Sequence, residues 1–135
     1  MAVHMELSRI FIRELNDYQL IELREVEGDR SFPILIGLPE AQAIERRLKG
    51  VEIKRPQTHE LLATVIETLG GELESISIND LADHTFFATI NIRKDGEILR
   101  VDSRPSDAIA LGVAGGVPIF VEEHVLESAQ NDAPS

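Results

Sequence analysis

The chain has 135 residues, and its 13 Lys and Arg residues against 24 Asp and Glu residues give it a formal net charge of −11. This length suits a single domain, and a hydrophobic share of 43% excludes a disordered or collagen-like chain. Because the sequence contains no cysteine, it has no disulfide, thiolate zinc site or cysteine nucleophile, and it fits a reducing compartment.

The sequence carries no signal for membrane insertion or secretion. No apolar stretch approaches the roughly 20 residues that span a bilayer, and residues 1–13 lack the basic and apolar regions of a secretory signal. We therefore expect a cytoplasmic protein with no membrane partner. The net charge of −11 also disfavours a nucleic-acid partner, although a divalent cation held by carboxylates can invert the local field.

The N-terminal part of the sequence is typical of a β-hairpin. Residues 7–15 and 18–26 are rich in β-forming residues, and the Asn16-Asp17 pair between them tolerates a tight turn. A third, short strand is predicted over residues 32–36. We expect residues 1–6, which precede this pattern, to form a flexible N-terminus.

Two helices are predicted next. The first opens at Leu38-Pro39-Glu40, where proline and an acid suit a helix start, and it ends at Gly50. The second has Thr58 as its expected N-cap and stops at Gly70-Gly71. Its apolar residues recur with helical spacing, at Leu61, Leu62, Val65, Ile66 and Leu69.

The C-terminal half predicts more strands, interleaved with helices. Residues 73–81 and 85–93 alternate as strands do, and Lys94-Asp95-Gly96 indicates a hairpin that returns through residues 98–103. A helix begins near Pro105, and the remaining elements are a strand at 117–121, a helix at 122–129 and a flexible tail at 130–135. The pattern predicts an α+β fold, with mainly antiparallel sheets and three to four helices in one compact domain over residues 7–129.

The densest polar cluster, from Asp102 to Asp107, lies where a strand passes into a helix. Such junctions hold ligands and anions, because helix N–H groups are free there. Asp102 and Asp107 could share a divalent cation, while Arg104 holds a phosphate. An equally concrete alternative has Ser106 or Asp107 capping the helix and Arg104 paired with Asp102.

His59 is the second candidate, at the start of the second predicted helix. It could act as a general base or a metal ligand, because its side chain titrates near neutrality. Adjacent helical residues point about 100° apart, so His59 and the neighbouring Glu60 cannot easily bind one metal. The alternative is an ordinary surface or capping histidine.

Proline and an acid recur at three helix starts, and Arg55 and Arg104 precede two of them. Each corner can be explained by ordinary capping. The alternative is that the three similarly built corners converge on one site. The phosphate-loop, dinucleotide-binding, serine-elbow and zinc-protease motifs are absent, which excludes the commonest classes of nucleotide-binding protein and hydrolase.

A series of landmarks occurs in one order along the chain: Pro33-Ile34-Leu35-Ile36-Gly37, Glu40-Ala41 with Ile44, Arg55-Pro56, Thr58-His59, Leu61-Leu62, Thr85-Phe86-Phe87-Ala88, the run from Asp102 to Leu111, and Pro118-Ile119. Together these motifs resemble the bifunctional nuclease (BFN) domain family, from about residue 7 to 128. The resemblance implies a compact α+β domain that is often dimeric. It also implies nuclease activity, because DNase and RNase activities are reported for plant members.

The polar landmarks of the family stand here at Glu40, Arg55, Thr58, His59, Asp102, Arg104, Ser106 and Asp107. They coincide with the three proline-marked corners, which favours a shared site. One departure follows Leu111, where the family usually continues with alanine and a basic residue. This chain has Gly112-Val113-Ala114-Gly115-Gly116 instead, so that end of the helix is less basic.

The leading hypothesis is a metal-dependent phosphodiesterase that cleaves DNA, RNA or both. Asp102 and Asp107, together with Glu40, would hold Mg²⁺ or Mn²⁺, and His59 would activate water. Substrate contacts would come from Arg55, Thr58, Arg104 and Ser106, with the arginines neutralising the phosphate. The rival hypothesis is a non-catalytic dimeric module that binds a small anionic ligand or a protein partner.

Overall fold

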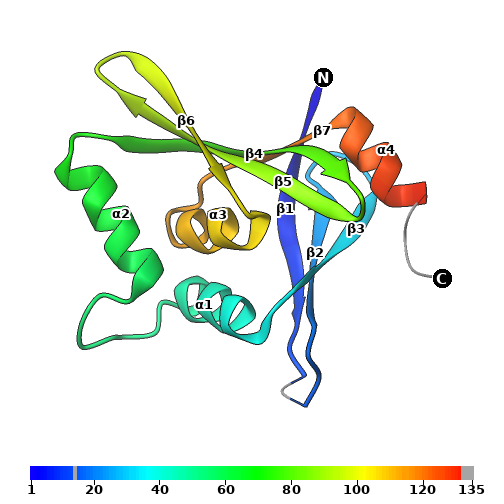
Figure 1. Ribbon diagram of the computed structural model, residues 1–135, viewed down its shortest axis with the longest axis horizontal. Coiled ribbons are helices and arrows are strands. Elements are labelled where there is room, and N and C mark those ends of the chain that lie inside the picture. The colour runs from blue at the N-terminus through cyan, green and yellow to red at the C-terminus, as the bar shows by residue number, and fades with distance from the viewer. Residues whose placement is uncertain (14, 132–135) are drawn as a thin grey trace.

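The computed structural model describes residues 1–13 and 15–131, and a seven-stranded sheet organises that part of the chain (Figure 1). The strand order is β3-β2-β1-β7-β4-β5-β6. Neighbouring strands are antiparallel except β4 and β7, which run parallel. The strands are β1 (Ala2–Phe11), β2 (Gln19–Glu25), β3 (Ser31–Ile36), β4 (Glu72–Ala82), β5 (Thr85–Lys94), β6 (Glu97–Ser103) and β7 (Ile119–Glu122).

Four α-helices complete the described fold: α1 (Leu38–Lys49), α2 (Thr58–Thr68), α3 (Pro105–Gly112) and α4 (Glu123–Asn131). A short 3₁₀ helix, η1 (Val113–Gly115), follows α3. This arrangement confirms the predicted α+β class, with a mostly antiparallel sheet in one compact domain. Within residues 1–13 and 15–131, none of the helices combines the length and apolar character needed to cross a bilayer.

The two ends of the chain differ from expectation. β1 begins at Ala2 rather than Leu7, because residues 2–5 pair with β7, from Ala2 opposite Glu122 to Met5 opposite Ile119. Residues 2–6 therefore belong to the sheet and do not precede the folded domain. At the other end, α4 extends to Asn131, so residues 130 and 131 are helical, and the rest of the expected tail lies outside the described residues.

Helix α3 is the buried centre of the helical layer. It packs against α1, α2, β4 and β5, and nearly all of its residues are buried (Figure 1). Gly112 permits the close approach of its neighbours. A Cβ atom there would lie only 2.7 Å from Ile76 Cδ1 and 3.1 Å from Val117 Cβ. The glycine at the first position of the departure after Leu111 therefore has a packing explanation.

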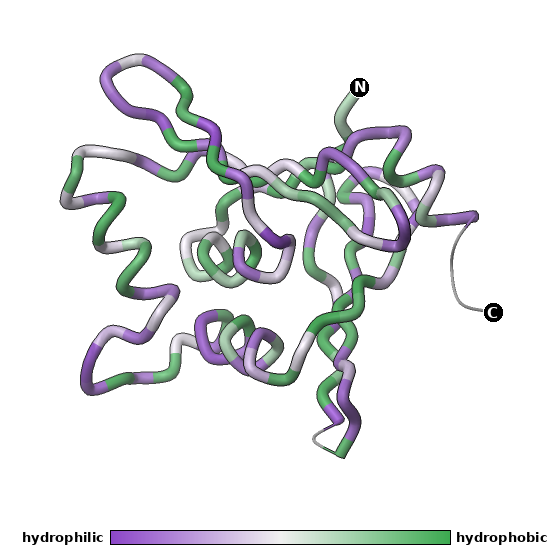
Figure 2. The backbone as a smooth tube through the Cα atoms, viewed as in Figure 1, coloured by the Kyte–Doolittle hydropathy of each residue, from purple (hydrophilic) through white to green (hydrophobic). Residues whose placement is uncertain are grey.

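Helix α2 forms where predicted, but its apolar stripe is largely uncovered. Leu61, Val65 and Leu69 are 53%, 44% and 67% exposed, and the helix's one buried residue is His59. Figure 2 shows hydrophobic segments along this helix, which lies at the side of the molecule. The N-cap is Gln57 rather than Thr58, which is the first helical residue.

Candidate functional site

The starts of α1, α2 and α3 meet at one pocket of about 430 Å³, which we call the dyad pocket. Its lining residues come from all three proline-marked corners and from the body of α1: Pro39, Glu40, Gln42, Ala43, Arg46, Gln57, Thr58, His59, Arg104 and Asp107. The three proline-marked corners therefore converge on one pocket, which is the alternative to independent helix capping that the sequence left open.

A histidine–carboxylate dyad lines this pocket. His59 Nε2 is 3.0 Å from Asp107 Oδ1, and the His59 side chain is almost fully buried. Burial by itself raises the pKa of Asp107, but hydrogen bonds from Arg104 and His59 outweigh burial and hold that pKa below its ordinary value. Asp107 is therefore ionised at neutral pH.

The dyad fixes the chemistry of the imidazole ring. An ionised carboxylate only accepts hydrogen bonds, so His59 Nε2 carries the proton and the free lone pair of the neutral ring is on Nδ1. Nδ1 has no hydrogen-bond partner among the described residues. Among the described residues no side-chain nitrogen or oxygen is both unpartnered and fully sealed from solvent, so Nδ1 keeps some contact with solvent although the His59 side chain is almost fully buried. In this tautomer Nδ1 is the ring nitrogen that can accept a proton.

Arg104 joins the two acidic corners. Its Nε donates to Asp107 Oδ2 at 2.9 Å and its Nη2 to Asp107 Oδ1 at 3.2 Å, while Nη1 donates to Glu40 Oε1 at 3.2 Å. These three bonds use three of the five guanidinium N–H groups. The side chain remains 63% exposed, so the other two N–H groups are available to an anion.

The three predicted metal ligands are not assembled into a site. Asp102 lies opposite Thr89 in the β5–β6 ladder, whereas the next residue, Ser103, lies opposite the buried Ala88. Alternation along the strand therefore points Asp102 to the other face of the sheet. Glu40 and Asp107 already share Arg104 as their cation, and the described residues contain no group of three potential ligands placed to hold a metal.

Two arginines of α1 that the sequence analysis did not single out support the site. Arg46 lines the dyad pocket and donates to Glu60 Oε2 at 3.3 Å. Arg47 donates to the carbonyl groups of Ala110 and Leu111 and so ties α1 to α3. Glu60 thus faces the arginines while His59 faces Asp107, as their angular separation on a helix predicts. The basic residues in the last turn of α1 were the sequence signal that could have indicated this role of Arg46 and Arg47.

The remaining predicted substrate contacts are divided between different surfaces. Thr58 lines the dyad pocket. Arg55 is exposed on the connection between α1 and α2, and it makes no ion pair with the described residues. Ser106 is 6% exposed and lines a second pocket.

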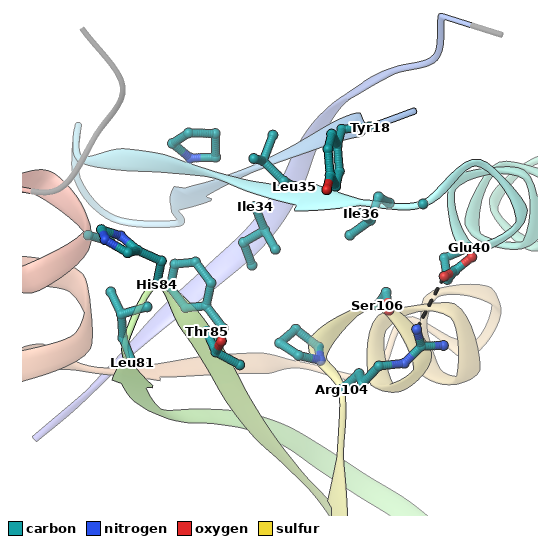
Figure 3. A pocket seen from close by; sticks show the side chains of 15 residues that line it. Tyr18, Ile34, Leu35, Ile36, Glu40, Leu81, His84, Thr85, Arg104 and Ser106 are labelled. Carbon is teal, nitrogen blue, oxygen red and sulfur yellow. Dashed lines mark hydrogen bonds and ion pairs between the residues drawn. The ribbon is translucent and has the colours of Figure 1, made fainter. Parts of the chain in front are cut away.

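This second pocket, which we call the β3 cleft, also measures about 430 Å³. Figure 3 shows Ile34 facing Leu81 and Thr85 across the cleft, Leu35 on the other side of β3, and the Arg104–Glu40 pair at one end. Its lining residues come from β3, the β4–β5 turn and the start of α3: Tyr18, Pro33, Ile34, Leu35, Ile36, Gly37, Glu40, Leu81, His84, Thr85, Phe86, Arg104, Pro105, Ser106 and Ala129. Arg104 and Glu40 therefore border both pockets.

Comparison with known proteins identifies the family. The model of the bifunctional nuclease domain matches residues 21–134, which is most of the chain. The chain belongs to the bifunctional nuclease domain family. The match includes the three corners that form the dyad pocket, so the resemblance seen in the sequence is confirmed.

Relatives within this family differ in length and in what their names state. An uncharacterised protein of Mycobacterium tuberculosis is 41% identical over 120 residues, which is 89% of this chain and 71% of that protein. Bifunctional nuclease 2 of Oryza sativa is 29% identical over 131 residues, which is 94% of this chain but 40% of the plant protein. Bifunctional nuclease 1 of Arabidopsis thaliana is 25% identical over 100 residues, which is 72% of this chain and 31% of that protein.

Proposed function

We propose that this bifunctional nuclease domain hydrolyses phosphodiester bonds of DNA or RNA in the dyad pocket. The observation that carries the proposal is the His59 ring, whose Nε2 is held by the ionised Asp107 beside a partly exposed Arg104 and whose Nδ1 has no partner among the described residues. The plant relatives named as nucleases support the same class of reaction. Nucleic acid is therefore the proposed partner, despite the net charge of −11.

In the proposed reaction, His59 Nδ1 removes a proton from a water molecule while the water oxygen attacks phosphorus. The bond from phosphorus to the leaving oxygen breaks on the opposite side, that oxygen takes a proton from solvent, and the imidazolium returns its own proton to solvent, giving a phosphomonoester and an alcohol. Asp107 stabilises the imidazolium, because it is ionised and lies 3.0 Å from Nε2. The free N–H groups of Arg104 stabilise the extra negative charge on the phosphate.

No step of this reaction is assigned to a metal ion. Glu40 and Asp107 already bind Arg104, and Asp102 lies on the other face of the sheet, so the donor set expected for Mg²⁺ or Mn²⁺ does not fit the described geometry. Assays with Mg²⁺, with Mn²⁺ and with EDTA therefore test the metal hypothesis directly. Loss of cleavage in EDTA would require a donor arrangement different from this one.

The test is cleavage of a single-stranded DNA and an RNA oligonucleotide by highly purified protein. His59→Gln and Asp107→Asn should each abolish most of the activity. His124→Gln is the matched control, since His124 lies on α4 outside both pockets and is 65% exposed. Cleavage at the same rate by all four proteins would refute the assignment of the dyad pocket.

The rival function is a non-catalytic module that binds a small anion or a protein. Its supporting observation is that Arg104 makes three hydrogen bonds to Glu40 and Asp107, which a purely structural arginine would also make. Under this alternative, no oligonucleotide is cleaved under any metal condition. Arg104→Ala would then lower thermal stability with no activity to lose.

We also propose a cytoplasmic homodimer. The uncovered apolar stripe of α2 includes Leu61, Val65 and Leu69, and burying such surface is favourable. A second copy presents the same stripe, so one two-fold contact covers both. The absence of cysteine fits a reducing compartment such as the cytoplasm.

A further inference from the structure

We propose that the β3 cleft binds one unpaired nucleobase, whose attached phosphate contacts Arg104. This inference rests on the proposed nuclease function and names the form of its substrate. Arg104 and Glu40 are the two residues that border both pockets. A phosphate bound at Arg104 would therefore place its nucleoside on the side of the cleft and its reacting bond on the side of His59.

The cleft has the composition that a nucleobase requires. Its lining includes the exposed Leu35 and the partly exposed Leu81 and Phe86, which offer apolar surface to the faces of a flat ring. Tyr18 is 69% exposed and extends along one wall beside Leu35 and Ile36 (Figure 3). A base that enters can stack on an aromatic ring of this kind, whatever its identity.

The cleft also contains a polar group with no partner in the protein. Ser106 is 6% exposed, yet its hydroxyl makes no hydrogen bond with the described residues. None of the buried side-chain oxygens of the described residues is both fully sealed and unpartnered, so the Ser106 hydroxyl keeps some contact with solvent, and Ser106 lines the cleft. It lies in the first turn of α3, whose free N–H groups also favour a negatively charged or accepting ligand.

The size of the cleft limits the ligand to about one nucleotide. Its volume of about 430 Å³ is at the lower end of the range for small-molecule sites, roughly 300–1,000 Å³. A base that remains paired and stacked in a duplex cannot enter a cleft of this kind without being extruded. Single strands should therefore be cleaved faster than a duplex of the same sequence, by roughly tenfold or more.

The experiment measures binding separately from cleavage. Adenosine 5′-monophosphate, adenosine and inorganic phosphate are titrated into the full chain, and calorimetry gives each affinity. Tyr18→Ala should weaken binding of the nucleotide by roughly fivefold to a hundredfold, and Ser106→Ala by about two- to tenfold. Binding of inorganic phosphate should be unchanged in Tyr18→Ala.

Phe87→Ala is the matched control. Phe87 is the neighbour of Phe86 on β5 and is 42% exposed, but alternation points it to the other face of the sheet and it does not line the cleft. Its nucleotide affinity should equal that of the unmodified chain. Far-ultraviolet circular dichroism of all three variants confirms that the fold is intact.

The outcomes separate the two proposals. Nucleotide binding that Tyr18→Ala and Ser106→Ala weaken, without cleavage of any oligonucleotide, would support the cleft and refute the nuclease mechanism. Cleavage of duplex and single strand at equal rates, with nucleotide affinity unchanged in both variants, would overturn the cleft and leave the mechanism standing. Phosphate that binds as tightly as the nucleotide would also overturn the nucleobase assignment.

Discussion

His59 Nε2 lies 3.0 Å from Asp107 Oδ1, although 48 residues separate them in the chain. The two residues occupy the first turns of α2 and α3, and α3 packs against both α1 and α2. The dyad is therefore a product of helix packing, and its geometry depends on the position of the buried α3. This relationship gives the proposed nuclease its sharpest test.

Asp107→Asn should lower the rate of oligonucleotide cleavage by about 10²- to 10⁴-fold. An amide can donate a hydrogen bond to His59 Nε2, which favours the tautomer with the proton on Nδ1 and removes the base. The measurement is the single-turnover rate with saturating protein, alongside circular dichroism to confirm folding. A rate within twofold of the unmodified chain would show that Asp107 does not orient His59.

Stability should fall in acid partly through Asp107. Its pKa is lowered in the folded protein, so its contribution to the free energy of unfolding is present above the ordinary aspartate pKa of about 4 and is lost as the pH falls through the folded value. Urea unfolding between about pH 2 and pH 7 measures this dependence. Asp107→Asn should show a shallower loss below about pH 4, and identical curves would contradict the linkage.

Gly112→Ala should destabilise the protein by about 1–3 kcal/mol, because the added methyl group would overpack the space between Ile76 and Val117. Gly115→Ala is the control. A Cβ atom at Gly115 would lie 3.9 Å from Val117 Cγ2, which is an ordinary contact. Chemical unfolding of both variants measures the difference, and equal midpoints would show that the first turn after α3 absorbs the extra volume.

The double variant Val65→Lys with Leu69→Lys should be monomeric if the α2 stripe forms the proposed dimer. Two buried lysines would be too costly to desolvate at a two-fold contact. Light scattering during size-exclusion chromatography gives the mass of each species. Val26→Lys, at an exposed apolar residue beyond β2, should remain dimeric. An unmodified chain that elutes as a monomer at all concentrations would refute the dimer.

Local sequence determined most of the elements. The Lys94-Asp95-Gly96 turn has positive φ at Asp95 and Gly96, as its composition predicts, and Gly50 ends α1 in the left-handed conformation. Pro39 and Pro105 correctly predicted where α1 and α3 begin. These signals succeed because they depend on backbone sterics and capping within a few residues.

Tertiary structure decided the site and the ends of the sheet. The alternation of β6 sends Asp102 away from Asp107, and Arg104 pairs with Glu40 and Asp107 instead of Asp102. The pairing of residues 2–5 with β7 joins segments more than a hundred residues apart. The sequence predicted that three acidic, proline-marked corners exist. Only the packing of α3 against α1 and α2 determines which charged side chains meet, because such contacts depend on distance in space and not on spacing along the chain.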